Sequence, residues 1–196
     1  MDADHCKFET NALLSSIADN RKFSSGEPVI DAFFHEKAEQ SDAEFHTQTT
    51  LMFADHNLVG FYSSSVRTFE IRYPDFKDFV REEMLRPEEL DAMETGDELS
   101  YPAINLQYFA INQNRQRNGL GRIMMRTFLS EIAAAYLDHG LGFSGVFLYA
   151  LPDAVIFYQK SGFRVLNGID FENGPDLQQY PMFLSTKKVL DYYAEG

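Results

Sequence analysis

Two adjoining stretches decide the fold: Ile104-Asn105-Leu106-Gln107-Tyr108-Phe109-Ala110-Ile111 and Arg115-Gln116-Arg117-Asn118-Gly119-Leu120-Gly121-Arg122. The first is apolar and aromatic and predicts a strand, and Ile123–Ala133 after the second predicts a helix. A glycine-containing turn between a strand and a helix presents several backbone N–H groups in one direction, and the helix dipole adds partial positive charge there. The pattern predicts a phosphate or pyrophosphate site, with a tight connection that binds nothing as the alternative.

The glycine spacing distinguishes this loop from two other phosphate-binding loops. A dinucleotide fingerprint needs three glycines as G-x-G-x-x-G, and a Walker loop ends in Gly-Lys-Ser/Thr. Here only Gly119 and Gly121 are present, and no Gly-Lys-Ser/Thr follows. Three arginines around the turn favour an anionic ligand, because guanidinium pairs well with phosphate oxygens.

Composition indicates a globular protein with an acidic surface. At 196 residues and 22.5 kDa, with 44% hydrophobic residues, we expect one domain over residues 1–196 with a proper core. The net charge of -13 disfavours nucleic acid, which would need a local basic patch, and suits cationic partners or simply solubility. tRNA is left open as a partner.

The chain shows no sign of export or membrane insertion. The N-terminus carries acidic residues where a signal peptide needs a basic and then an apolar region, and no apolar run approaches membrane-spanning length. A cytoplasmic location without membrane association is the expectation. Cys6 is the single cysteine, so no intramolecular disulfide forms, and we interpret it as incidental.

Periodicity predicts further elements in a mixed α/β order. The expected helices are Thr10–Asn20, one from Pro28 to Ala38 followed by a non-helical polar run Glu39–Glu44, the loop helix as far as Leu137, Ala154–Lys160 opened by Pro152, and Lys187–Ala194. The expected strands are Phe45–Phe53, Leu58–Val66, Ile104–Ile111, Ser144–Ala150, Phe163–Leu166 and Tyr180–Ser185. An acidic helical insertion is expected at about residues 69–103, with helices near Asp75–Leu85 and from Pro87.

The order of these features resembles the GNAT superfamily of acyl-CoA-dependent N-acyltransferases. Its loop motif, Q/R-x-x-G-x-G/A, corresponds to Gln116-x-x-Gly119-x-Gly121. Its later helix, commonly A-x-x-F-Y-x-x-x-G-F, corresponds to Ala154–Phe163. The resemblance covers Leu106–Phe163 and implies a mixed, mainly antiparallel sheet with a splayed central strand, flanked by helices.

A narrower resemblance is to the GNAT toxins of toxin–antitoxin pairs. Phe23–Phe33 looks like their F-x-S/C-G-x-x-x-L-D-x-W/F stretch, and Val59–Ser63 looks like their third strand. Those toxins acetylate the amine of aminoacyl-tRNA. This chain departs from them in its charge of -13 and in the strongly acidic segment Phe69–Tyr101.

The resemblance implies transfer of an acetyl group from acetyl-CoA, as cosubstrate and without a metal, to a primary amine. The pyrophosphate is expected on the loop backbone and the pantetheine arm beside the end of the strand, with the Ile111 N–H polarising the thioester carbonyl. The residues implied for this binding are Phe109, Ala110, Ile111, Gln116, Arg117, Asn118, Gly119, Leu120, Gly121 and Arg122.

Tyr158 is the implied catalytic residue. A phenol can protonate the CoA thiolate or hydrogen-bond to it as it leaves. The alternative is an ordinary aromatic residue on an amphipathic helix. No general base is assigned, although Glu70 and the acidic insertion are sources of carboxylate.

Three functions follow from these observations. The leading one is an N-acetyltransferase for a cationic amine, with the acidic insertion shaping the acceptor site. The alternatives are a toxin-type transferase acting on aminoacyl-tRNA and a CoA-binding or interaction module without catalysis. A homodimer is compatible with the family but is not indicated by any residue.

Overall fold

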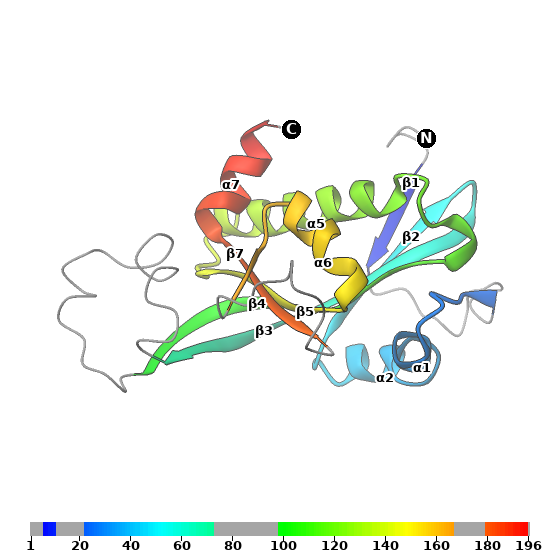
Figure 1. The fold of residues 1–196 in the computed structure, drawn as a ribbon, viewed down its shortest axis with the longest axis horizontal. Helices are drawn as coiled ribbons and strands as arrows, with labels where there is room; N and C mark the ends of the chain where they lie inside the picture. Colours follow the sequence, from blue (N-terminus) through cyan, green and yellow to red (C-terminus); the bar gives the residue numbers. More distant parts are fainter. Residues whose placement is uncertain (1–5, 11–21, 73–97, 167–178, 196) are drawn as a thin grey trace. The chain divides into compact units, whose positions relative to one another are not determined.

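The computed structural model describes residues 6–10, 22–72, 98–166 and 179–195 (Figure 1). The chain divides into two compact units, residues 1–65 with 106–128 and residues 66–105 with 129–196. Strands β3 (Asn57–Arg72) and β4 (Glu98–Ile111) and helix α5 (Leu120–Leu137) contribute residues to both units.

The strands form one sheet in the order β1-β2-β3-β4-β5-β7-β6. Pairing is antiparallel between β1 and β2, β2 and β3, β5 and β7, and β6 and β7. The parallel ladder between β4 and β5 joins Ile104 to Val146 and Asn105 to Phe147, and the described residues show no further register position in it. The predicted fold class, a mixed α/β protein with a mainly antiparallel sheet flanked by helices, is confirmed.

The first unit is built on a hairpin of β2 (Gln48–Ala54) and β3, with β1 (Cys6–Thr10) along the outer edge of β2. The hairpin turns at Asp55 and His56, which both have positive φ, 50° and 63°, as a two-residue turn of the primed kind requires. β1 was not predicted, because its five residues carry little periodic signal.

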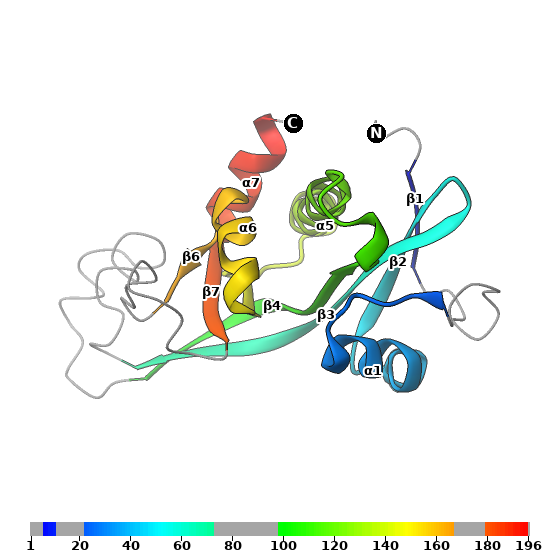
Figure 2. The ribbon, with the colours of Figure 1, turned by 45° about the vertical axis from the view of Figure 1, so that its right-hand side comes forward.

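Helices cover both faces of this hairpin (Figures 1 and 2). Successive strand residues point to opposite faces. Phe61 therefore packs against Phe34 of α1 (Pro28–Glu36), with ring centroids 4.6 Å apart, while Tyr62 packs against Phe128 of α5 at 5.2 Å. The short helix α2 (Ala38–Ala43) adds Ala38 to the α1 side, where Phe23 and Phe33 complete the core.

Gly60 permits the close approach of β4 and α5 in this unit. A Cβ at Gly60 would lie 2.7 Å from Ile111 Cδ1, 2.9 Å from the Ala110 carbonyl oxygen and 3.1 Å from Met124 Sδ. Contacts below 3 Å force the neighbours to move, so a side chain here would displace the end of β4. That strand end is where the pantetheine arm is expected.

The second unit centres on β5 (Gly145–Ala150) and β7 (Tyr180–Ser185), with β6 (Arg164–Val165) beyond β7. Phe69 of β3 stacks on Phe183 at 5.0 Å and lies 5.4 Å from Phe147. A short 3-10 helix η5 (Pro152–Ala154) leads into α6 (Val155–Lys160), and α7 (Thr186–Glu195) follows β7 and contacts β5 and β7. The helices expected from Ala154 and from Lys187 are confirmed, as are the strands at β5 and β7.

Two sequence expectations in the first 50 residues are wrong. Phe45 does not begin β2: its φ is 59° and its side chain is 95% exposed. Residues Glu39 to Ala43 are helical instead of irregular, and the carboxylate of Asp42 accepts a bond of 2.9 Å from the Thr49 N–H, which ties α2 to the start of β2. This helix is short and carries no apolar stripe, so hydrophobic periodicity did not predict it.

The expected acidic insertion is narrower than residues 69–103. Residues 69–72 belong to β3 and residues 98–103 belong to β4. In β3, Phe69 packs in the sheet, whereas its neighbours Thr68 and Glu70 are exposed. The helices expected near Asp75–Leu85 and from Pro87 lie outside the described residues, as does most of the helix expected at Thr10–Asn20.

Candidate cofactor loop and catalytic tyrosine

The candidate cofactor loop joins β4 to α5 through one 3-10 turn, η4 (Gln113–Arg115). Asn112 anchors its start: its backbone N–H donates to the Val59 carbonyl at 2.8 Å, and its Oδ1 accepts from the Asn114 N–H at 3.1 Å. The loop therefore leaves the sheet in a defined direction.

The second half of the loop presents unpaired backbone donors. The Gly119 carbonyl accepts from the N–H groups of Arg122 and Ile123 at 3.1 and 3.2 Å, which closes the first turn of α5. Within the described part of the chain, the N–H groups of residues 117–121 donate to no protein acceptor. Unpaired N–H groups at a helix N-terminus form a site for an anion.

Gly119 is required by its backbone conformation. Its φ is 82°, in the left-handed region that only glycine adopts at little cost, and a Cβ there would meet no atom within 4 Å. The space beside Gly119 is therefore open to a ligand. Arg117 also has a positive φ, 63°, which turns the chain within the same loop.

The side chain of Gln116 holds the loop in place. Although the residue is exposed, its Nε2 donates to the Ser25 carbonyl at 2.9 Å and to the Ile111 carbonyl at 3.0 Å. Beside it, the Gln113 N–H donates to the Ser24 carbonyl at 2.8 Å. The first position of the loop motif thus joins the loop to the end of β4 and to the segment before α1.

Asp31 fixes the segment on which the loop rests. Its carboxylate accepts from Ser24 Oγ at 2.7 Å, from the Ser25 N–H at 2.7 Å and from Ser25 Oγ at 2.6 Å. Desolvation by burial raises the pKa of Asp31, but the hydrogen bonds from Ser25 and Ser24 outweigh it and hold this pKa below its usual value.

Asp31 was not predicted as the acceptor for Ser24 and Ser25. The signal was a carboxylate five residues beyond Gly26, inside the first turn of the helix that begins at Pro28.

Arginines surround the loop as predicted. Arg115, Arg117 and Arg122 are all exposed, and none forms an ion pair with a described carboxylate. All the residues implied for acetyl-CoA binding, from Phe109 to Arg122, lie in the first unit. Among them Ala110 and Ile111 are 5% and 8% exposed.

Tyr158 lies in the second unit, on α6. Its ring contacts Phe163 edge-on at 5.7 Å and Phe157 at 5.2 Å, and 8% of the residue is exposed. Burial raises the pKa of the Tyr158 phenol above its ordinary value. The phenol is therefore protonated throughout the neutral range and can donate a hydrogen bond.

The histidines are structural or solvated where the structure describes them. His35 uses Nε2 in a hydrogen bond of 2.9 Å with the Phe23 carbonyl, and His46 lies 3.4 Å from Glu44 on the surface. The described residues contain no group of three or more His, Cys, Asp and Glu side chains that could hold a metal ion. In the same residues, no helix combines the length and apolar character needed to cross a membrane.

Comparison with known proteins places these features in context. The chain matches no protein-family model. It is 25% identical over 153 residues to a tRNA-acetylating toxin of Mycobacterium tuberculosis (strain ATCC 25618 / H37Rv), covering 78% of this chain and 82% of the toxin.

Among solved structures, a bacterial toxin superposes with a TM-score of 0.74 at 18% identity, over 97% of this chain and 96% of that one. A mutant of the toxin KacT gives 0.70 at 20% identity, over 95% and 98%. AtaT complexed with acetyl-methionyl-tRNAfMet gives 0.66 at 18% identity, over 94% and 96%.

These similarities extend over nearly the whole length of the solved toxin structures. At 18–20% identity they show a shared fold. The resemblance to GNAT toxin-like acetyltransferases is confirmed. It was predicted from Phe23–Phe33 and Val59–Ser63 in addition to the loop and the Tyr158 helix, and the structural similarity covers 97% of the chain.

Proposed function

We propose that this protein is an N-acetyltransferase that moves an acetyl group from acetyl-CoA to the α-amine of an aminoacyl-tRNA. The observation that carries the proposal is the row of unpaired N–H groups at residues 117–121, directly after the end of β4. A pyrophosphate needs converging donors of this kind. The 25% identity to a tRNA-acetylating toxin supports both the reaction and the acceptor.

The donor side of the reaction uses the first unit. The pyrophosphate binds the N–H groups of residues 117–121, and Gln116 keeps them aligned through its bonds to Ser25 and Ile111. The pantetheine arm lies along Phe109–Ile111, and the Ile111 N–H donates to the thioester carbonyl oxygen as negative charge develops there. AtaT has been solved with acetyl-CoA bound, at a TM-score of 0.69 to this chain.

Tyr158 acts on the leaving group. As the amine nitrogen bonds to the carbonyl carbon, the C–S bond breaks and CoA leaves as a thiolate. A thiol has a pKa of about 8.5 and a phenol about 10, and burial raises the pKa of Tyr158 further. A hydrogen bond from the phenol to the thiolate is therefore favoured over complete proton transfer, and the proton lost by the amine goes to solvent.

The absence of an assigned base favours an α-amine over an alkyl amine as acceptor. With a pKa of about 7.8, roughly a third of α-amino groups are unprotonated at pH 7.5, against about one alkyl amine in a thousand at a pKa of 10.4. An aminoacyl acceptor needs far less help with deprotonation than the cationic amine of our leading sequence-based hypothesis. The contribution of the acidic insertion remains a prediction, since residues 73–97 lie outside the described part of the chain.

The experiment that tests the proposal is turnover with a panel of acceptors. We expect thiol release from acetyl-CoA with aminoacyl-tRNA, and only background release with uncharged tRNA, N-acetylated aminoacyl-tRNA or a polyamine. Thiol release with the polyamine alone would indicate that the acceptor is a small cationic amine. CoA binding without thiol release from any acceptor would identify a non-catalytic module.

A cellular test addresses the toxin-type function directly. Induced expression should arrest growth and deplete free α-amines on charged tRNA, and Tyr158→Phe should relieve the arrest at equal protein level. Normal growth with normally charged tRNA would argue against this acceptor.

A further inference from the structure

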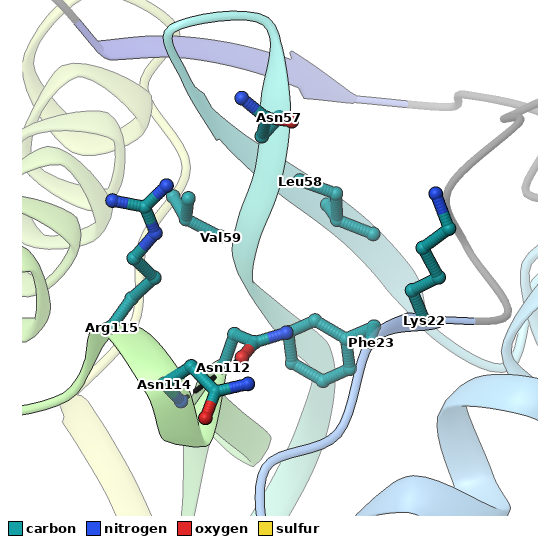
Figure 3. A pocket seen from close by; sticks show the side chains of 8 residues that line it. All are labelled: Lys22, Phe23, Asn57, Leu58, Val59, Asn112, Asn114 and Arg115. Carbon is teal, nitrogen blue, oxygen red and sulfur yellow. Dashed lines mark hydrogen bonds between the residues drawn. The ribbon is translucent and has the colours of Figure 1, made fainter.

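The segment Phe23–Gly26, which we call the bridge segment, lies between helix α1 and the cofactor loop in the first unit. On the loop side, the Ser24 carbonyl accepts a hydrogen bond from the Gln113 N–H at 2.8 Å. The Ser25 carbonyl accepts one from Gln116 Nε2 at 2.9 Å. Figure 3 shows the start of the bridge segment beside the 3-10 turn η4. The loop therefore rests on two consecutive carbonyl groups of this segment.

Asp31 of α1 binds the same two residues through their donors. Its carboxylate accepts the Ser25 N–H and the hydroxyls of Ser24 and Ser25, at distances from 2.6 to 2.7 Å. Because a peptide group is planar, the Ser24 carbonyl and the Ser25 N–H turn together as one rigid unit. Asp31 holds this unit by its N–H, and Gln113 holds it by its carbonyl. A rotation that breaks one of these bonds disturbs the other as well.

The partners of Asp31 show that it holds the bridge segment and does not cap the helix. Asp31 lies in the first turn of α1, where a carboxylate commonly stabilises a helix through the dipole or through first-turn N–H groups. Its three donors instead come from Ser24 and Ser25. Hydrogen bonds to an ionised acceptor are about twice as strong as neutral ones, so this attachment is firm.

Gln116 carries the attachment to the candidate anion site. Its side chain joins the Ser25 carbonyl to the Ile111 carbonyl, and the residue directly precedes the unpaired N–H groups of residues 117–121. An N–H donor must lie about 2.9 Å from a phosphate oxygen. A small shift of Gln116 therefore changes the fit of several donors at once.

We propose that Asp31 is a positioning residue for the cofactor loop. Through the Ser24–Ser25 peptide and Gln116, it sets the direction of the N–H groups of residues 117–121 and thereby the affinity for CoA. The effect on CoA rests on the proposed function, whereas the attachment of the loop to Asp31 does not. By linkage, bound CoA strengthens the attachment by the same factor as the attachment strengthens CoA binding.

Two carboxylates in the first unit provide a matched pair of variants. Asp31→Asn keeps the side-chain volume, removes the charge and replaces one acceptor oxygen with a donor. Asp42→Asn makes the same change at a carboxylate that also accepts three bonds, each of 2.9 Å, from the Thr47 hydroxyl and from the N–H and hydroxyl of Thr49. These bonds tie α2 to β2 and do not involve the loop. Both variants should lose stability in urea, and only Asp31→Asn should affect the loop.

The first measurement is amide hydrogen exchange without ligand, followed by NMR. The Gln113 N–H reports the contact with the bridge segment, and the Asn112 N–H, which donates to the Val59 carbonyl, is the internal reference. We expect the Gln113 N–H to exchange at least fivefold faster in Asp31→Asn, with less than twofold change at Asn112. Asp42→Asn should change neither amide more than twofold.

The second measurement is CoA affinity by calorimetry, in a double-mutant cycle with Gln116→Met. Asp31→Asn should weaken CoA binding at least fivefold, and Asp42→Asn less than twofold. In the Gln116→Met background, Asp31→Asn should weaken it only about twofold, because the connection to the loop is already broken. A general loss of stability would give the same factor in both backgrounds.

Each outcome decides the proposal. Unchanged exchange of the Gln113 N–H in Asp31→Asn, equal loss of CoA affinity in Asp31→Asn and Asp42→Asn, or additive effects in the cycle would overturn it. If Asp31→Asn does not fold, Ser25→Ala removes one donor to the carboxylate and should speed Gln113 exchange in the same direction. If the wild-type protein binds no CoA, the proposed function fails, and the exchange measurement still tests the attachment.

Discussion

Gly119→Ala separates the role of the loop in ligand binding from its role in stability. Gly119 has a φ of 82°, and a Cβ there meets no atom within 4 Å. Gly140, in the turn that follows α5, has a φ of 67°, and a Cβ there also meets no atom within 4 Å. Both positions require the left-handed conformation and neither has a steric restriction, so Gly140→Ala is a matched control for backbone strain.

The expected loss of stability is the same for both variants. A residue with a Cβ costs about 1–2 kcal/mol in the left-handed region, and no clash adds to it. For a chain of this size that corresponds to a fall in melting temperature of about 2–8 °C. Asn tolerates this conformation better than most residues, so Gly119→Asn should recover part of the stability.

The expected effect on CoA binding differs between the two variants. An N–H donor must approach a phosphate oxygen to about 2.9 Å, so a methyl group or an altered φ at Gly119 disturbs the pyrophosphate site. We expect Gly119→Ala and Gly119→Asn to weaken CoA binding at least tenfold in calorimetry, and Gly140→Ala to change it less than twofold.

The reasoning would be refuted by a specific result. Gly119→Ala and Gly140→Ala would lose the same stability and both retain wild-type affinity for CoA. The open space beside Gly119 would then hold no part of the ligand, and the unpaired N–H groups of residues 117–121 would be an ordinary helix N-terminus.

Three further predictions concern residues that position or perform the chemistry. Tyr158→Phe should lower turnover at least 100-fold, because the phenol acts on the departing thiolate. The affinity for CoA, measured by calorimetry, should change less than twofold. Undiminished thiol release would show that Tyr158 only packs in the core. Gln116→Met keeps the volume but removes two hydrogen bonds, so unfolding in urea should become easier by about 1–3 kcal/mol and CoA binding should weaken; equal effects in Gln113→Met would contradict this. The pKa of Asp31 is lowered in the folded protein, so its contribution to stability is present above the unfolded pKa of about 3.9 and is lost as the pH falls through the folded value. Asp31→Asn should therefore be less stable than wild type at pH 7 by about 1 kcal/mol, and the difference should shrink as the pH falls below about 3.9; a difference that stays constant over this range would rule out the role.

Local sequence patterns were sufficient to predict the elements on either side of the loop. The strand before it, the helix α5 after it and the α6 helix all follow from periodicity and from turn residues within about 15 positions of one another. The family resemblance of the loop and of the Tyr158 helix also rests on short-range motifs, and the wider similarity to the toxins agrees with it.

Features that depend on contacts between distant residues were not predictable in this way. Gln116 and Ser25 are 91 positions apart, so no window of sequence contains their hydrogen bond. Gly60 looks like an ordinary strand residue until Ile111 and Met124 are seen packed against it. A groove beside the loop likewise is lined, among the described residues, by three segments that are distant in sequence, around Phe23, Leu58 and Asn112 (Figure 3).

The sequence by itself determined that a glycine turn follows a strand and begins a helix, since backbone conformation depends on neighbouring residues. Only the tertiary structure decided that the turn is held by Gln116, rests on a segment fixed by Asp31 and leaves its N–H groups unpaired. Hydrogen bonds and packing between distant segments form only when the chain is folded, and they are what turn the loop into a candidate site.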